Sequence, residues 1–260
     1  MKKLFIRLAS IKQVTLNLIL FSQVLLIAVL LFSATLHKHD LEGALYYAEM
    51  KIHENTEDIT IDETGTEHGV GQMTTGQLNG WTFDAGIVNS GEGTTITAFA
   101  TAGGGQMTVS SANALSNGDP VTITDTTNYN GVYLVANVSG SDFEITHGDS
   151  GDDGQGQWRH PSNLITGANA AGVYKLSNGM SWNKGAGGAT VLEWHIFVNA
   201  TEQEQLHIDR TITTTGIGAM ALTGLVTVAA GDMLWMSVVS DTTNTVTYRN
   251  GNMSLIRVGV

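Results

Sequence analysis

Carboxylates and histidines are the side chains of this sequence that could do chemistry. Asp149, Asp152 and Asp153 in HGDSGDDGQG supply the oxygen donors that calcium prefers, but they lack the D-x-D-x-D-G rhythm and the terminal Glu of a calcium loop. Glu202 and Glu204 are a carboxylate pair of the type that glycosidases use, yet they alternate on one face of a predicted strand. An acidic loop and a solvated strand face are therefore the favoured interpretations.

The histidines offer imidazole, a common metal ligand. His37 and His39 flank a lysine directly after an apolar segment, where solvent-exposed side chains are the more usual outcome. His195 and His207 lie in two strand patterns, and a metal centre would need a tighter His/Glu cluster than the sequence displays. We therefore predict neither a metal site nor any other cofactor.

Catalytic and nucleic-acid-binding classes find little support. The sequence has no Cys, no G-x-S-x-G nucleophile elbow and no G-x-x-x-x-G-K-[ST] phosphate loop. No nucleophile, base and orienting group that support one another can be named, so we expect a protein that is not an enzyme. The formal net charge of −12 repels phosphates, which argues against a nucleic-acid partner.

The elements that must position these side chains are predicted to be strands. Tyr46–His53 and Thr190–Ala200 alternate apolar and polar residues, and similar short runs follow to the end of the chain. Gly residues number 31 and Pro residues only 2, which is typical of many tight turns. Beyond the first forty residues no helical period is convincing. The pattern predicts a mainly β protein, a sandwich or a barrel.

The first forty residues have a different character. From Val14 to Leu36 there is no charged residue, a length sufficient for a helix to cross a bilayer, which takes about 20 residues. Basic residues precede the run and acidic residues follow it, which places the bulk outside the cell if the segment spans a membrane. A helix socketed in a protein assembly and a cleaved signal peptide are the alternatives. The predicted anchor residues are Val14, Leu18, Phe21, Leu25 and Phe32.

Residues 115–145, LSNGDPVTITDTTNYNGVYLVANVSGSDFEI, carry a hairpin pattern. Val121–Ile123 and Val132–Val138 are separated by a Tyr-Asn-Gly turn, and Phe143–Ile145 follows a Gly-Ser-Asp turn. This segment resembles a small β-domain that recurs as an insert in tail-fibre and head-decoration proteins of bacteriophages.

Three further segments resemble tumour-necrosis-factor-like and complement-head-like jelly rolls. They are the opening YAEMKIHENTEDITI, the strand–turn–strand LVTVAAGDMLWMSVV and the close SDTTNTVTYRNGNMSLIRVGV. The resemblance implies a jelly-roll sandwich over 44–93 and 168–260, an inserted β-barrel-like domain over 94–167 and an N-terminal anchor helix over 1–40. It also implies a homotrimer, with core candidates Trp194, Phe197, Trp235 and Ile256.

Together these patterns favour a structural virion protein, a trimeric capsid-decorating or fibre-like component that contacts other virion proteins such as the capsid. One alternative is a receptor-binding module for host attachment, in which a loop containing Asn128, Tyr129, Asn130 and Asp142 touches host surface glycan. The other alternative is a bacterial adhesin anchored in a lipid membrane, with its C-terminal bulk outside the cell. The expected location is the virion surface or, for the adhesin, the membrane.

Overall fold

The computed structural model describes Ser22, Gln23, Ile27 and residues 46–52, 58–61, 64–71, 73–87, 94–148, 150–184, 188–212 and 216–259. Contacts divide the chain into two compact units, Met1–Leu45 and Tyr46–Val260. The predicted anchor helix and its residues Val14, Leu18, Phe21, Leu25 and Phe32 lie outside the described residues. Within the described part of the chain, no helix combines the length and the apolar character that crossing a bilayer requires.

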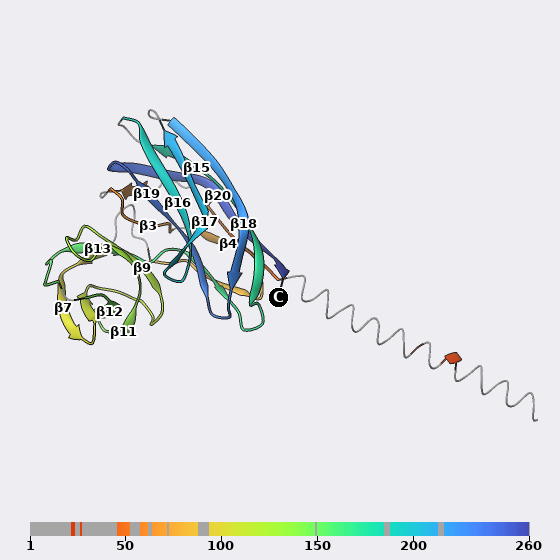
Figure 1. Cartoon of the computed structure of the whole chain (residues 1–260), viewed down its shortest axis with the longest axis horizontal. Helices are drawn as coiled ribbons and strands as arrows, with labels where there is room; N and C mark the ends of the chain where they lie inside the picture. Colours follow the sequence, from red (N-terminus) through yellow and green to blue (C-terminus); the bar gives the residue numbers. More distant parts are fainter. Residues whose placement is uncertain are drawn as a thin grey trace, which may run out of the picture. The chain divides into compact units, whose positions relative to one another are not determined.

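Two antiparallel six-stranded sheets form the larger part of the unit Tyr46–Val260 (Figure 1). The first sheet has the order β18 (Gly216–Val228), β15 (Gly172–Lys184), β20 (Asn244–Gly259), β1 (Tyr47–Ile52) and β4 (Thr74–Asn79), with β2 (Asp58–Ile61) paired to β20. The second has the order β17 (Thr201–Ile212), β16 (Thr190–Val198), β19 (Met233–Ser240), β14 (Asn163–Thr166) and β5 (Trp81–Asp84), with β3 (His68–Gly69) paired to β19.

The two sheets share one hydrophobic core, as expected for a β-sandwich. Every second residue of a strand enters this core because side chains alternate between the two faces of a strand. In β1 these residues are Ala48, Met50 and Ile52, which confirms the alternation predicted from the sequence. At the centre, the Trp194 ring lies 5.4 Å from that of Trp182, measured between ring centroids.

A second hydrophobic core lies between two four-stranded sheets, drawn yellow to green in Figure 1. One sheet has the order β10 (Gly131–Leu134), β9 (Pro120–Thr124), β13 (Gly156–Arg159) and β6 (Thr94–Ile96). The other has the order β11 (Ala136–Ser139), β12 (Asp142–Thr146), β8 (Gln106–Ser110) and β7 (Ala98–Gly103). We call this part of the unit the small β-module. The chain boundaries predicted for an insert stay predictions.

The hairpin predicted in residues 115–145 is confirmed, with two differences. β9 and β10 pair antiparallel, but the loop Asp125–Asn130 joins them and Gly131 already belongs to β10; β11 and β12 pair across the Gly-Ser-Asp turn. The run Val132–Val138 is not one strand, because it divides at the buried Val135 and its two halves join different sheets. The small β-module also touches the sandwich, since the Gly69 amide donates a hydrogen bond of 3.2 Å to Thr122 Oγ1.

Candidate functional site

The middle of the outer face of the first sheet, over β15, β18 and β20, is built from small, uncharged side chains. In β15 the residues with even numbers from Tyr174 to Trp182 enter the core, so those with odd numbers face outward. The register aligns them with outward residues of β18 and β20. The outward positions at the middle of the three strands are Ser177, Gly179, Ser181, Ala219, Ala221, Thr223, Asn250, Asn252 and Ser254.

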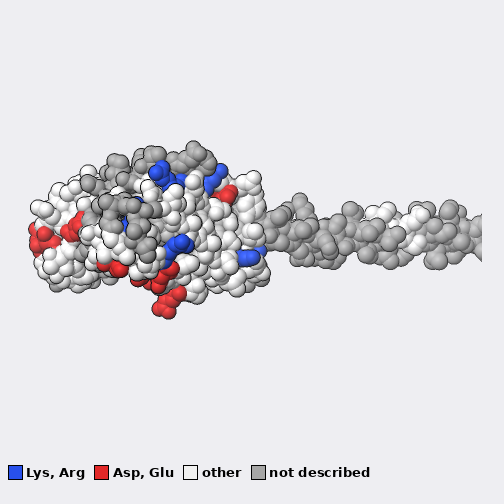
Figure 2. Space-filling model, turned by 90° about the horizontal axis from the view of Figure 1, so that it is seen from above, with Lys and Arg blue, Asp and Glu red and all other residues white. Residues whose placement is uncertain are grey.

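Large apolar side chains border this small-residue face at one end. Lys175 of β15 pairs with Leu225 on one side and with Ile256 on the other, so the three side chains form one cross-strand row. Leu225 is 56 % exposed, and Ile256 and Val258 are each 57 % exposed. Among the described residues drawn in Figure 2, most of the surface is neither blue nor red and so carries no charged side chain. Exposed apolar groups gathered beside an uncharged face are typical of an interaction surface.

The four residues predicted to lie at a trimer core do not share one environment. Trp194 belongs to the sandwich core of the single chain, so an axis contact by its ring is excluded. Phe197 and Trp235 are also buried, with their rings stacked at 4.5 Å between centroids. Trp235 Nε1 donates a hydrogen bond to the Asn199 carbonyl oxygen. Ile256 alone of the four is exposed and available to another chain.

The loop predicted to face a receptor is largely occupied by its own contacts. Tyr129 is fully buried, and its ring stacks on Phe99 at 4.4 Å between centroids, so the prediction of a receptor-facing Tyr129 is wrong. The Asn128 backbone amide and Nδ2 both donate to the Asp153 carboxylate. Asn130 Oδ1 accepts hydrogen bonds from the backbone amide and hydroxyl of Thr126. The fourth residue, Asp142, is half-buried at the start of β12.

The acidic loop that contains Asp152 and Asp153 makes hydrogen bonds to other parts of the same chain. Asp152 Oδ1 accepts hydrogen bonds from the backbone amides of Phe99 and Gly154, and these two bonds lower the pKa of Asp152. Asp149 lies outside the described residues. Asp152 and Asp153 therefore tie the loop to β7 and to Asn128, as the interpretation of a structural acidic loop expects.

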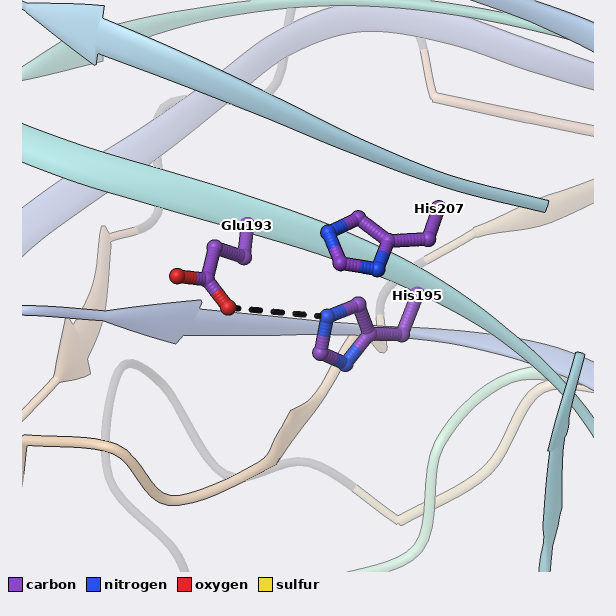
Figure 3. A group of neighbouring side chains, drawn as sticks. All are labelled: Glu193, His195 and His207. Carbon is purple, nitrogen blue, oxygen red and sulfur yellow. Dashed lines mark ion pairs between the residues drawn. The ribbon is translucent and has the colours of Figure 1, made fainter. Parts of the chain in front are cut away.

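A compact group of ionisable side chains surrounds His195, which is 7 % exposed. His195 of β16 and His207 of β17 are register partners, and their ring centroids lie 4.7 Å apart. Glu193 lies two residues before His195 on β16, and Figure 3 shows its carboxylate directed toward the His195 ring. Glu67 precedes β3, and Glu202 is the second residue of the return strand β17. We call these five residues the His195 cluster.

Hydrogen bonds hold the centre of the His195 cluster in place. His195 Nδ1 lies 2.5 Å from Glu67 Oε1, and the other carboxylate oxygen of Glu67 accepts a hydrogen bond from the Ser237 hydroxyl. Burial opposes protonation of His195, but the hydrogen bond and charge of Glu67, with the charges of Glu202 and Glu193, outweigh it and raise the pKa of His195. The fixed Glu67 carboxylate therefore orients the imidazole.

The sequence did not reveal this cluster, because strand register brings it together. After the turn at Asn199, Val198 pairs with Thr201 and Phe197 with Glu202. An unbroken hairpin would then place His195 opposite Glu204, but the register shifts before His195, and His207 becomes its partner. The premise that these histidines lack a tight His/Glu cluster is therefore wrong. The sequence indicates only that each of two neighbouring strand patterns contains a histidine, His195 in one and His207 in the other.

Comparisons with known proteins give no family. No protein-family model matches the chain, and no curated protein matches it. Among solved structures, the Eiger tumour necrosis factor of S. frugiperda is similar over 65 % of this chain and 94 % of that chain, at 10 % identity and a TM-score of 0.29. A likeness at this level carries no conclusion about the function of this chain.

Proposed function

We propose that this chain is a non-enzymatic structural protein that assembles as a homotrimer through the outer face of its first sheet. The observation that carries the proposal is the small-residue face with the exposed side chains Leu225, Ile256 and Val258 at its end. Small side chains let two sheets approach closely, and burial of the apolar side chains supplies a driving force of about 25 cal/mol per Å².

The occupant of this face is a second copy of the same chain. Charged residues are only 14 % of the sequence, a low share for a surface that stays solvated on all sides. Beside the face, β1 carries Glu49 and Lys51, whose charges of opposite sign can pair across copies at the rim of an interface, whereas Lys175 lies within the row, between Leu225 and Ile256. In a closed threefold assembly, the three copies bring the same row of residues to one axis.

The virion assignment rests on the sequence resemblances. The two-layer β-sandwich is an architecture that a jelly roll also has, and the small β-module occupies the segment that resembles inserts of phage fibre and head-decoration proteins. In this proposal the trimer lies on the virion surface as a capsid-decorating or fibre-like component, and the apolar segment between Val14 and Leu36 anchors it in a membrane or in a protein socket.

A glycan-binding module for host attachment and a membrane-anchored adhesin are the second candidates. The glycan-binding alternative loses its aromatic platform, because Tyr129 is buried in the small β-module. Stacking of a sugar on an aromatic face is a large part of the affinity that such loops provide. The adhesin alternative depends on the N-terminal segment, which lies outside the described residues.

The experiment is the oligomeric state of full-length variants, measured by light scattering in mild detergent. The double variant Leu225→Lys and Ile256→Lys places two charges in the proposed interface, and we expect it to be monomeric because a buried unpaired charge opposes association. Leu134→Lys is the matched control, since Leu134 is an exposed apolar side chain of the small β-module. It is expected to leave the trimer intact.

The outcomes separate the alternatives. A trimer that survives the double variant refutes the proposed interface. A trimer lost equally in the double variant and in Leu134→Lys indicates a general loss of folding, which far-ultraviolet circular dichroism of each variant detects. A wild-type chain that is monomeric at micromolar concentration refutes the proposed assembly as a whole.

A further inference from the structure

We propose that the His195 cluster is a binding site for a divalent first-row transition-metal ion, with Glu193, His195 and His207 as its protein ligands. This site goes beyond the proposed assembly and does not depend on it, because the small-residue face is on the first sheet and the cluster is on the second. Zn²⁺ is the ion that best fits a mixture of imidazole and carboxylate donors.

The ligand atoms are already gathered. One donor atom from each of Glu193, His195 and His207 lies within 4.8 Å of the other two. Donors around a tetrahedral Zn²⁺ ion are separated by about 3.4 Å, since each metal–ligand bond is about 2.1 Å long. Moderate rotations of the half-exposed Glu193 and His207 side chains are therefore enough to close the site.

The strongest observation is a buried nitrogen atom, His195 Nε2, that could bind a metal ion and has no hydrogen-bond partner. His195 Nε2 is buried and makes no hydrogen bond, and the carboxylate oxygen Glu193 Oε2 lies 3.8 Å from it. A buried polar atom without a partner costs stability, so it needs a reason. Figure 3 shows that this edge of the His195 ring faces Glu193, with the His207 ring beside it. A metal ion bound here satisfies the His195 lone pair.

The other nitrogen of His195 is already committed to Glu67. Because Nδ1 is 2.5 Å from Glu67 Oε1, it donates its proton there, which in the neutral ring leaves the lone pair on Nε2. A carboxylate behind a histidine is the arrangement that orients metal-binding imidazoles in proteins. Glu67 therefore acts as a positioning residue, and the Ser237 hydroxyl holds it from behind.

The charges around the site also favour a cation. Glu67, Glu193 and Glu202 all lie within 4.0 Å of a His195 nitrogen, and Asp209 lies 2.5 Å from His207 Nε2. Carboxylates held this close repel one another, and a divalent ion relieves that repulsion. Glu202 Oε1 lies 3.9 Å from Nδ1 of both histidines, so its charge adds to the negative charge around the site without making it one of the three gathered ligands.

The test is metal binding by the untagged full-length chain in mild detergent at neutral pH. Zn²⁺ is expected to raise the thermal midpoint of unfolding, because an ion that binds only the folded state stabilises it. Co²⁺, used as a spectroscopic probe, is expected to give the intense visible absorption of a tetrahedral ion with nitrogen and oxygen ligands. His207→Gln and Glu193→Gln are each expected to weaken Zn²⁺ binding at least about tenfold.

Three variants serve as controls. Glu204→Gln removes the same charge from an exposed position of β17, and His147→Gln removes an imidazole from the small β-module. The double variant His37→Gln and His39→Gln removes the other histidine pair of the sequence. All three are expected to keep the Zn²⁺ affinity of the wild type. Glu67→Gln is expected to keep the Co²⁺ spectrum but to weaken binding about 10–100-fold.

The proposal is overturned if Zn²⁺ and Co²⁺ fail to bind at micromolar concentration. It is also overturned if His207→Gln and Glu193→Gln bind as the wild type does, or if the His37/His39 variant alone abolishes binding. Both ligand variants change half-exposed side chains, so metal-free thermal midpoints close to the wild type are expected and separate lost binding from lost folding.

Discussion

Replacement of Tyr129 by phenylalanine tests whether this side chain belongs to a core or to a receptor surface. The Tyr129 hydroxyl donates to the Gly151 carbonyl oxygen at 2.5 Å and accepts from the Ser150 amide at 3.1 Å. Phenylalanine keeps the stack on Phe99 and removes these two hydrogen bonds, together with the 3.9 Å contact of the hydroxyl with Met107 Sδ. Each of these two hydrogen bonds is worth about 0.5–1.5 kcal/mol, so Tyr129→Phe is expected to destabilise the fold by about 1–3 kcal/mol.

The assay is urea unfolding followed by tryptophan fluorescence. With an m-value of about 2 kcal/mol per molar urea, the midpoint of unfolding is expected to fall by about 0.5–1.5 M. Thr127→Ala is the control, since Thr127 is an exposed neighbour and its loss is expected to change stability by less than about 0.5 kcal/mol. An unchanged midpoint for Tyr129→Phe would refute the reasoning, and loss of binding to a host glycan at unchanged stability would restore the receptor interpretation.

Two further predictions concern His160 and the neighbouring Gly86. Burial lowers the pKa of His160 despite the opposing charges of Asp119 and Asp84, so stability is expected to fall as the pH drops below 6.5 and to level off below the folded-state pKa. The urea midpoint of His160→Gln is expected to fall less than that of the wild type between about pH 7.5 and 5.5. Gly86→Ala is expected to cost about 1–3 kcal/mol in thermal unfolding, because Gly86 has a φ of +72° and a Cβ there would lie 2.3 Å from the His160 carbonyl oxygen. Equal pH slopes in wild type and His160→Gln, or an unchanged midpoint for Gly86→Ala, would contradict these two accounts.

Much of the β-architecture follows from local patterns. The alternation that ends at Ile52 predicts which side chains of β1 are buried. Asn130-Gly131 predicts a hairpin, which forms, although the loop Asp125–Asn130 and not a tight Asn-Gly turn connects its strands. These signals depend only on neighbours along the chain. They do not say which sheet a strand joins, and so the run around Val135 was predicted as one strand although its halves join two sheets.

The candidate sites depend on contacts between distant segments. Tyr129 lies beside a turn, where exposure is the usual expectation, but Phe99 offers its ring a stacking surface some thirty residues earlier in the sequence. His195 meets His207 only because the register of β17 shifts, and Glu67 reaches His195 only because β3 pairs with β19. No local period of the sequence carries such information.

Native mass spectrometry of the untagged full-length chain, released from mild detergent at micromolar concentration, tests the proposed assembly most directly. The account predicts one dominant species with three times the chain mass of 27.6 kDa. It also predicts that the double variant Leu225→Lys and Ile256→Lys yields the single chain. A monomeric wild-type chain, or a double variant that remains trimeric, would contradict the account.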